Sequence, residues 1–278
     1  MVANLYFQGV AFAGDIPPLP TGLIEFDCSY TLISGGLVGS NFAGLNRLNY
    51  LLMDGNAYNA SVPTEFGALP KLQYFYISDA FVSGDLSYMQ GMPAIYENWI
   101  DVNPGLTGPV FSFIGALSTL ASFSVTANSL TGTLPTELGN LAAMVQMWYY
   151  DNNIRGTIPS EIGNLVRMKT LELEGNALTG TMPSQICART GSFGLLTTLG
   201  ADCATVNVSK NLPRSWQGQA LSKKQDSLLL ANHFFAYLLL ADPFFCQLHF
   251  SALAALVVAL LFASQRGMGV NKDLDFAH

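Results

Sequence analysis

Charged residues are scarce in this chain of 278 residues. Only 11% of it is Asp, Glu, Lys or Arg, while 50% is apolar, and that balance excludes a disordered protein. Bases are scarcer still, 12 against 19 acids, so a basic face that neutralises nucleic-acid phosphates is not expected. The four cysteines are too few for a disulfide scaffold.

Histidine is missing from residues 1–203. A Ser-His-Asp or Cys-His catalytic arrangement is therefore excluded there. The region also has no Walker loop, no dinucleotide-binding fingerprint and no Cys/His cluster at zinc spacing. We predict no catalytic residue, no cofactor, no metal and no enzymatic activity. A carboxylate pair such as Glu97 and Asp101, acting as in a glycosidase, is the alternative that these residues leave open.

A repeat of 24 residues organises most of the chain. Residues 117–140, 141–164 and 165–188 align without gaps; they share apolar residues at positions 0, 3, 6, 8, 13 and 17, Asn at 11, Gly at 15 and Pro at 18, counting each copy's first residue as 0. The register continues backwards through 45–68, 69–91, 92–116 and a degenerate 20–44 to a partial first copy. Residues 1–188 are thus predicted to hold about eight repeats.

Each shared position has a physical role. Positions 6 and 8, for example Phe75 and Ile77, lie on one face of a short strand, and neighbouring strands stack about 4.8 Å apart. Glycine at 15 permits a tight bend, and proline at 18 ends strand pairing. Val10, Thr31 and Ala80 replace the asparagine, so we expect a broken ladder in the first half. At position 11 a buried amide satisfies backbone groups of two coils, and it is present as Asn56, Asn103, Asn128, Asn152 and Asn176.

The run LVRMKTLELEGNALTGTMP in the last copy resembles the plant-type leucine-rich repeat, LxxLxLxxNxLxGxIPxxLGxL. The resemblance covers residues 1 to about 203. It implies an α/β repeat solenoid, a right-handed horseshoe with a concave parallel β-sheet and with 3₁₀ segments or turns on the convex side. The run NLYFQG near the start looks like most of a protease-cleavage tag, but its Leu5 and Phe7 fit positions 6 and 8 of the register.

Residues 189–203 are similar to the cysteine cap that closes extracellular leucine-rich repeat domains. The ICA and ADCA phrases around Cys187 and Cys203 are closest in style to microalgal, diatom-like receptor-like proteins. The resemblance implies a Cys187–Cys203 disulfide and an oxidising compartment; two free buried thiols are the alternative. Cys28, at position 8, is predicted to be a core residue.

Beyond the cap the composition changes. Residues 204–243 are interpreted as a linker, 244–263 as a transmembrane helix of twenty residues without formal charge, and 264–278 as a short tail. A read-through or mis-spliced tail is the alternative to a membrane anchor. No signal peptide is visible, because Met1 already lies within a repeat, so we expect a truncated N-terminus.

The outward strand positions 5, 7, 9 and 10 are where specificity is expected. Position 7 carries an incomplete aromatic row, Tyr6, Tyr76, Trp99 and Trp148, which suits sugar rings or apolar peptide side chains. The alternative is that these rings pack on one another and merely cover the sheet. Acids beside them favour a basic or hydroxyl-rich ligand; calcium is an alternative that these carboxylates leave open. The predicted ligand-binding residues are Tyr50, Tyr74, Tyr76, Glu97, Trp99, Asp101, Trp148, Tyr150 and Glu172.

Two glycosylation sequons, at Asn59 and Asn207, agree with secretion. The sequence as a whole predicts a non-enzymatic recognition module, extracellular or anchored once in the plasma membrane with its ectodomain outside. Its partner is a protein, a peptide or a carbohydrate. A secreted inhibitor of a cell-wall-degrading enzyme, similar to polygalacturonase inhibitors, is the second hypothesis.

Overall fold

The structure is a computed structural model that describes residues 2–11, 13–190 and 194–201. The chain divides into two compact units, Met1–Gln219 and Ala220–His278, and all described residues belong to the first. The predicted linker, membrane helix and tail lie outside the described residues. None of the helices in the described part has the length and hydrophobicity needed to cross a bilayer.

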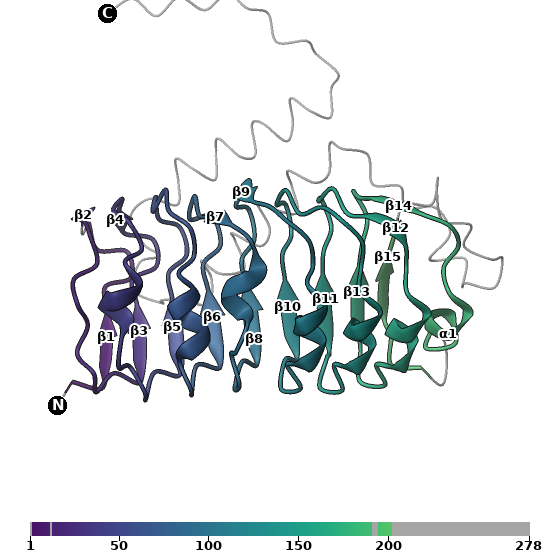
Figure 1. Cartoon of the computed structure of the whole chain (residues 1–278), viewed down its shortest axis with the longest axis horizontal. Helices are drawn as coiled ribbons and strands as arrows, with labels where there is room; N and C mark the ends of the chain where they lie inside the picture. The colour runs from purple at the N-terminus through teal and green to yellow at the C-terminus, as the bar shows by residue number, and fades with distance from the viewer. Residues whose placement is uncertain (1, 12, 191–193, 202–278) are drawn as a thin grey trace, which may run out of the picture. The chain divides into compact units, whose positions relative to one another are not determined.

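The described residues form a solenoid built on one parallel sheet, as the repeat predicts (Figure 1). Every pairing aligns the same repeat positions; Phe123, for example, lies beside Met147, and Met147 beside Leu171. The nine strands, in spatial order, are β1 (Asn4–Tyr6), β3 (Glu25–Asp27), β5 (Tyr50–Leu52), β6 (Tyr74–Tyr76), β8 (Glu97–Trp99), β10 (Ser122–Ser124), β11 (Gln146–Trp148), β13 (Thr170–Glu172) and β15 (Thr198–Gly200).

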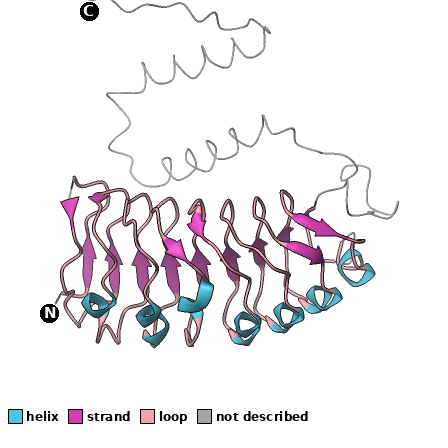
Figure 2. Ribbon diagram, turned by 45° about the horizontal axis from the view of Figure 1, so that its top comes forward, coloured by secondary structure: helices cyan, strands magenta, loops and turns pink. Residues whose placement is uncertain are grey.

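Short helices form the opposite, convex layer (Figures 1 and 2). Proline at position 18 immediately precedes several of them; Pro159, with φ −63° and ψ 134°, caps the helix Ser160–Asn164. Its fixed φ ends the extended segment and starts the turn. The helices are η1 (Gly39–Phe42), η2 (Thr64–Ala68), η3 (Leu86–Met89), η4 (Ser112–Ala116), η5 (Thr136–Asn140), η6 (Ser160–Asn164) and the single α-helical turn α1 (Ser184–Cys187).

Three small parallel sheets form after the chain has left the main sheet, along the segments that lead to the convex layer. Glycine at position 15 is required there: Gly156 has φ +84°, and a Cβ on it would lie 2.9 Å from the Thr133 methyl carbon of the preceding coil. The glycine therefore serves both the bend and the close approach of two coils. These sheets pair β2 (Ala13–Gly14) with β4 (Leu32–Ile33), β7 (Ser83–Gly84) with β9 (Gly105–Leu106), and β12 (Arg155–Thr157) with β14 (Ala177–Thr179).

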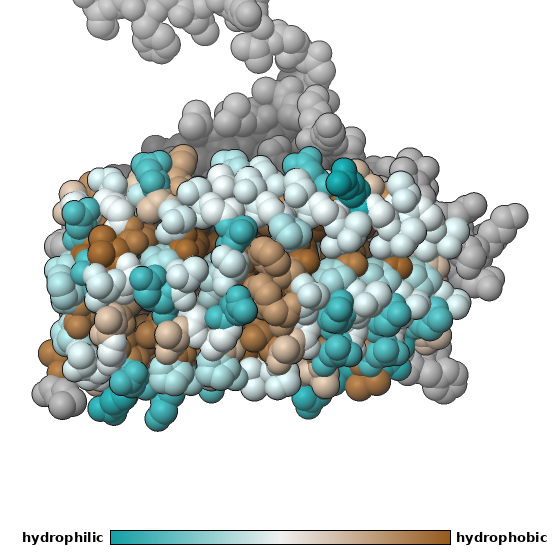
Figure 3. Space-filling model, viewed as in Figure 1, coloured by the Kyte–Doolittle hydropathy of each residue, from teal (hydrophilic) through white to brown (hydrophobic). Residues whose placement is uncertain are grey.

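The core runs continuously between the layers and consists of the predicted apolar positions. The convex face is mostly pale and teal, and apolar surface shows mainly in furrows between coils (Figure 3). One core position departs from the pattern: Asn98, at position 6, is fully buried and exchanges hydrogen bonds with the Tyr88 hydroxyl at 3.0–3.1 Å. A buried amide is tolerated here because it has this partner.

The asparagine ladder links each coil to the one before it. The Asn152 amide donates to the Val125 and Tyr149 carbonyls at 2.9 and 3.1 Å, and its oxygen accepts from the Leu130 N–H at 3.0 Å. Donor and acceptor are thus both used, as a buried amide requires.

The expected break in this ladder at Thr31 is wrong. The buried Thr31 hydroxyl lies 2.6 Å from Asn56 Oδ1 and 3.1 Å from the Cys28 carbonyl, so it continues the ladder. Both neighbouring oxygens are acceptors, so the hydroxyl, which has one proton, donates to one of them at a time. Ala80 has no side-chain group that could join the ladder, and the amide oxygen of Asn103 accepts from the Ala80 N–H at 3.1 Å.

Both ends of the described solenoid extend the register. Leu5 pairs with Phe26, which confirms that Leu5 of the NLYFQG run occupies position 6 of the register. In the predicted cap, Leu199 pairs with Leu171, so residues 189–203 contribute a ninth strand. Cys28 is fully buried, 3.4 Å from the Tyr58 hydroxyl, as expected of a core residue.

Candidate functional site

The outward face of the main sheet brings the predicted binding residues together. Strand alternation places seven of them on this face within β5, β6, β8, β11 and β13, and Asp101 and Tyr150 follow β8 and β11 two residues after the last strand residue. Most of their side chains are half-buried, and Tyr50 is the exposed exception at 36%. The face is therefore a packed surface with ring edges and carboxylates available on it.

Three aromatic rings at position 7 form a continuous row. Tyr76 and Trp99 are stacked, with centroids 4.7 Å apart and planes 15° apart, and Trp99 meets Trp148 edge to face at 6.1 Å. Since β10 lies between β8 and β11, two strand spacings of about 4.8 Å separate the two tryptophans, and their indoles must lean together over the small Ser124. The Trp99 indole N–H donates to the Ser122 hydroxyl at 2.9 Å, which fixes the ring.

The row is shorter than its sequence pattern suggests. Tyr6, three strands from Tyr76, is 55% exposed and donates from its hydroxyl to a Glu25 carboxylate oxygen at 2.5 Å. A second stack, Tyr50 on Tyr74 at 4.4 Å, stands beside the row at position 5. The rings therefore pack on one another, as the alternative interpretation predicts, and their role in ligand binding stays a prediction.

Carboxylates border the aromatic row and are held in place by neighbours. Glu97 accepts the Tyr76 hydroxyl at 2.6 Å, and Asp101 accepts the Ser124 hydroxyl at 2.6 Å and the Thr126 N–H at 2.7 Å. These fixed contacts position both acids along the sheet. A glycosidase role for Glu97 and Asp101 stays a hypothesis.

Burial raises the pKa of two acids on this face. Burial, with the nearby charge of Asp101, raises the pKa of Asp54 to about 7, although its carboxylate accepts the Ser78 N–H at 2.6 Å. Burial and the charge of Glu174 raise the pKa of Glu172 to about 7. The negative charge of the face consequently changes near neutral pH. Asp54 shares position 9 with Asp101, a signal by which the sequence could have added it to the predicted site.

No base lies at an outward strand position among the described residues. The six Lys and Arg of residues 1–203 lie before the strands, on the small sheets or in the cap: Arg47, Lys71, Arg155, Arg167, Lys169 and Arg189. The face is thus acidic without internal compensation at those positions. In the described part of the chain no group of three or more His, Cys, Asp or Glu side chains is arranged to hold a metal ion.

Comparison with solved structures identifies the fold. A TDR receptor structure superposes with a TM-score of 0.67 at 26% identity, over 72% of this chain and 34% of that one. The chain has the plant-type leucine-rich repeat fold. The ectodomain of the membrane receptor kinase GASSHO1/SCHENGEN3 from Arabidopsis thaliana follows, with TM-score 0.60, 26% identity and coverage of 68% and 22%.

A third neighbour of this leucine-rich repeat domain, PEPR1–AtPEP1, has TM-score 0.58, 26% identity and coverage of 64% and 24%. The chain thus spans about a third of the first neighbour's length and less than a quarter of the other two. No protein-family model and no curated protein matches it. The resemblance to microalgal proteins stays a prediction.

The predicted modification sites are only partly covered by the described leucine-rich repeat domain. Asn59 is exposed, with φ 48°, and its amide donates to the Ala57 carbonyl at 3.2 Å. Cys187, at the end of α1, is half-buried and unpaired among the described residues. Cys203 and Asn207 lie outside the described residues, so the disulfide and both glycosylation sites stay predictions.

Proposed function

We propose that the leucine-rich repeat domain is a non-enzymatic recognition module that binds a basic segment of a protein or peptide on its concave face, outside the cell or at its surface. The observation that carries this proposal is the Tyr76–Trp99–Trp148 row, bordered by carboxylates and without a base at any outward strand position of the described chain. Aromatic side chains supply large apolar contacts, and the acids select positive charge.

The structural neighbours support a polypeptide ligand. GASSHO1/SCHENGEN3 was solved in complex with CASPARIAN STRIP INTEGRITY FACTOR 2, and PEPR1 with AtPEP1. The first of these is the ectodomain of a membrane receptor kinase, which supports an extracellular place for the same fold here. The ligand-binding residues are those predicted on the sheet, with Asp54 added.

Binding of defined probes to the full chain tests the proposal. Synthetic peptides of net positive, zero and negative charge, and pectin and β-glucan oligosaccharides, are arrayed together. We expect the positive peptides to bind. Added salt should lower their affinity, because salt screens the attraction of the acids. The double variant Trp99→Ala, Trp148→Ala should lower their affinity at least tenfold.

The matched control is Phe113→Ala, which removes a stacked ring from η4 on the convex side and should leave affinity unchanged. Melting temperatures of all variants establish that they fold. Binding of oligosaccharides alone, or equal affinity of the tryptophan variant, would contradict the proposal. Inhibition of a pectin-degrading enzyme that is lost in the tryptophan variant would favour the inhibitor hypothesis instead.

A further inference from the structure

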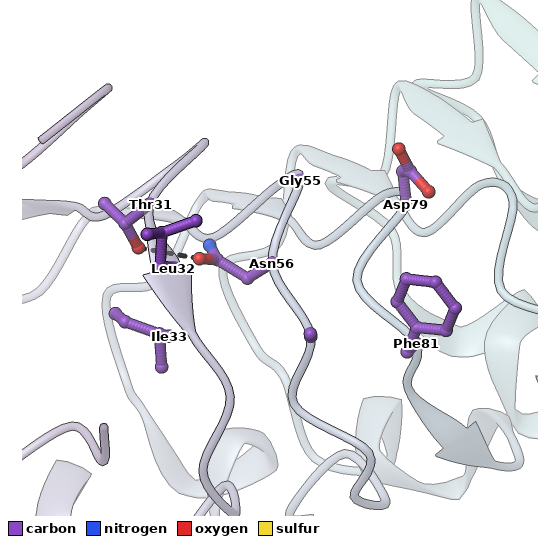
Figure 4. Close-up of a pocket in the computed structure, with 8 residues that line it drawn as sticks. Thr31, Leu32, Ile33, Gly55, Asn56, Asp79 and Phe81 are labelled. Atoms are coloured by element: carbon purple, nitrogen blue, oxygen red, sulfur yellow. Dashed lines mark hydrogen bonds between the residues drawn. The ribbon is translucent and has the colours of Figure 1, made fainter. Parts of the chain in front are cut away.

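A hollow of about 290 Å³ lies beyond the carboxyl ends of β3, β5 and β6, beside the concave sheet (Figure 4). This volume is near the lower limit of ligand-binding pockets and suits one or two side chains. Three adjacent coils line it, through Thr31, Leu32, Ile33, Gly55, Asn56, Ala57, Asp79 and Phe81.

The hollow arises from a large–small–large pattern at repeat position 12. Leu32, Ala57 and Phe81 occupy this position in consecutive coils, so a methyl group stands between two large side chains. In Figure 4 Leu32 and Phe81 lie on either side of Asn56. The space above Ala57 is therefore the missing volume of a third large side chain.

The walls of the hollow are apolar side chains exposed to solvent. Leu32 is 63% exposed and Phe81 58%, although both are residue types that folding normally buries. Phe81 also has φ 52°, a left-handed conformation that is costly for a bulky residue. Tyr30, 42% exposed, adds a second ring next to this hollow, where it packs over Gly55. Apolar side chains gathered in this way are typical of an interaction site.

Asn56, the ladder asparagine that lines the hollow, already uses its amide oxygen and its amide nitrogen in hydrogen bonds. Asn56 Oδ1 lies 2.6 Å from the Thr31 hydroxyl, and Asn56 Nδ2 donates to the carbonyls of Cys28 at 2.9 Å and Met53 at 3.1 Å. A group that enters the hollow thus gains by burying apolar surface.

The rim carries a negative charge. Asp79 is exposed, and its carboxylate makes no hydrogen bond to any described residue; its backbone N–H donates to the Asp101 carbonyl at 2.9 Å. In Figure 4 this carboxylate points outward above Phe81. Asp79 can therefore pair with a positive charge on a partner bound in the hollow.

We infer that this hollow is a second binding site, which takes one apolar side chain of a partner polypeptide that carries a lysine or arginine next to it. Leu32 and Phe81 bury the apolar side chain, and Asp79 pairs with the neighbouring base. The site is separate from the aromatic row of the concave face, so it does not depend on the function proposed above.

A phage-displayed library of random dodecapeptides, selected on the full chain, tests this inference. Peptides that bind the hollow should share an apolar residue adjacent to Lys or Arg. Ala57→Leu fills the hollow and should lower their affinity at least tenfold. Asp79→Asn, an exposed substitution that leaves the core intact, should lower it severalfold and reduce its dependence on salt.

The matched control is Ala177→Leu, at the same repeat position in a distant coil. The Ala177 N–H donates to Ile154 at 2.8 Å just as that of Ala57 donates to Ile33 at 2.9 Å. We expect Ala177→Leu and the concave variant Trp99→Ala, Trp148→Ala to keep full affinity for these peptides. The inference is overturned if no peptide depends on Ala57, if uncharged peptides bind equally well, or if only the tryptophan variant loses binding.

Discussion

Position 10 of the repeat has a left-handed backbone in the eight coils for which the structure describes it. The chain leaves the outward face of the sheet here, and φ at this position lies between 49° and 68° in every coil. Three coils use glycine, which adopts this conformation without strain. For the others it costs roughly 1–2 kcal/mol. The residues are Gly9, Tyr30, Gly55, Asp79, Val102, Ala127, Asp151 and Gly175.

Glycine at one of the strained positions should stabilise the protein. Ala127 has φ 54°, and its N–H donates to the Tyr150 carbonyl at 3.1 Å, a bond that glycine keeps. We expect Ala127→Gly to raise the free energy of unfolding by about 0.5 kcal/mol, because relief of strain exceeds the entropy that glycine adds to the unfolded chain. Denaturant unfolding measures this. Ala142→Gly, where φ is not positive, should destabilise; equal effects at both sites would exclude strain as the cause.

At the scale of the element, no strand of this protein could persist by itself. Each strand of the main sheet has only three residues, and its pairing partners, the neighbours of its buried side chain and an acceptor for its ladder amide lie in adjacent coils. Stability is then a sum of similar interfaces between neighbouring coils. A substitution that destabilises one coil therefore also weakens its interfaces with the two coils beside it.

Leu171 tests the strand register directly. Its side chain is fully buried in β13, between Met147 of β11 and Leu199 of β15. We expect Leu171→Ala to lower the free energy of unfolding by about 2–5 kcal/mol, because it leaves a cavity. The control, Thr170→Ala on the outward face, should cost less than about 0.5 kcal/mol. A loss for Leu171→Ala as small as the control's would show that this residue does not face the core.

For the whole described domain, the dominant electrostatic feature is an acidic concave face with partly desolvated carboxyls. Asp54 and Glu172 have ordinary pKa values of 3.8 and 4.5, and burial raises both to about 7. The folded state therefore holds these protons more tightly than the unfolded chain does. The resulting stabilisation is complete below about pH 4 and is lost as the pH rises to about 7.

The melting temperature should therefore fall between pH 4 and pH 7 through these two groups. We expect the double variant Asp54→Asn, Glu172→Gln to show a smaller fall, since neither amide titrates and the amide oxygen introduced at position 54 can still accept the Ser78 N–H. Thermal unfolding followed by circular dichroism at several pH values measures it. Glu137→Gln, an exposed residue of η5, is the control and should leave the slope unchanged.

The sequence alone determined the coil period, the strand register and the convex helices, because every coil repeats the same side-chain pattern and the same glycine and proline constraints. It also placed the nine predicted binding residues on one face, since strand alternation is a local property. The left-handed backbone at position 10 was visible only where glycine marks it, at Gly9, Gly55 and Gly175.

Tertiary structure decided how side chains of adjacent coils meet. Trp99 and Trp148 approach over Ser124 because that residue is small, and a hollow opens above Ala57 because Leu32 and Phe81 flank it. Such contacts join residues more than twenty positions apart, and they depend on the volumes and rotamers of both partners. The repeat pattern specifies the backbone position from which each side chain projects. Packing against the next coil specifies the conformation that the side chain adopts.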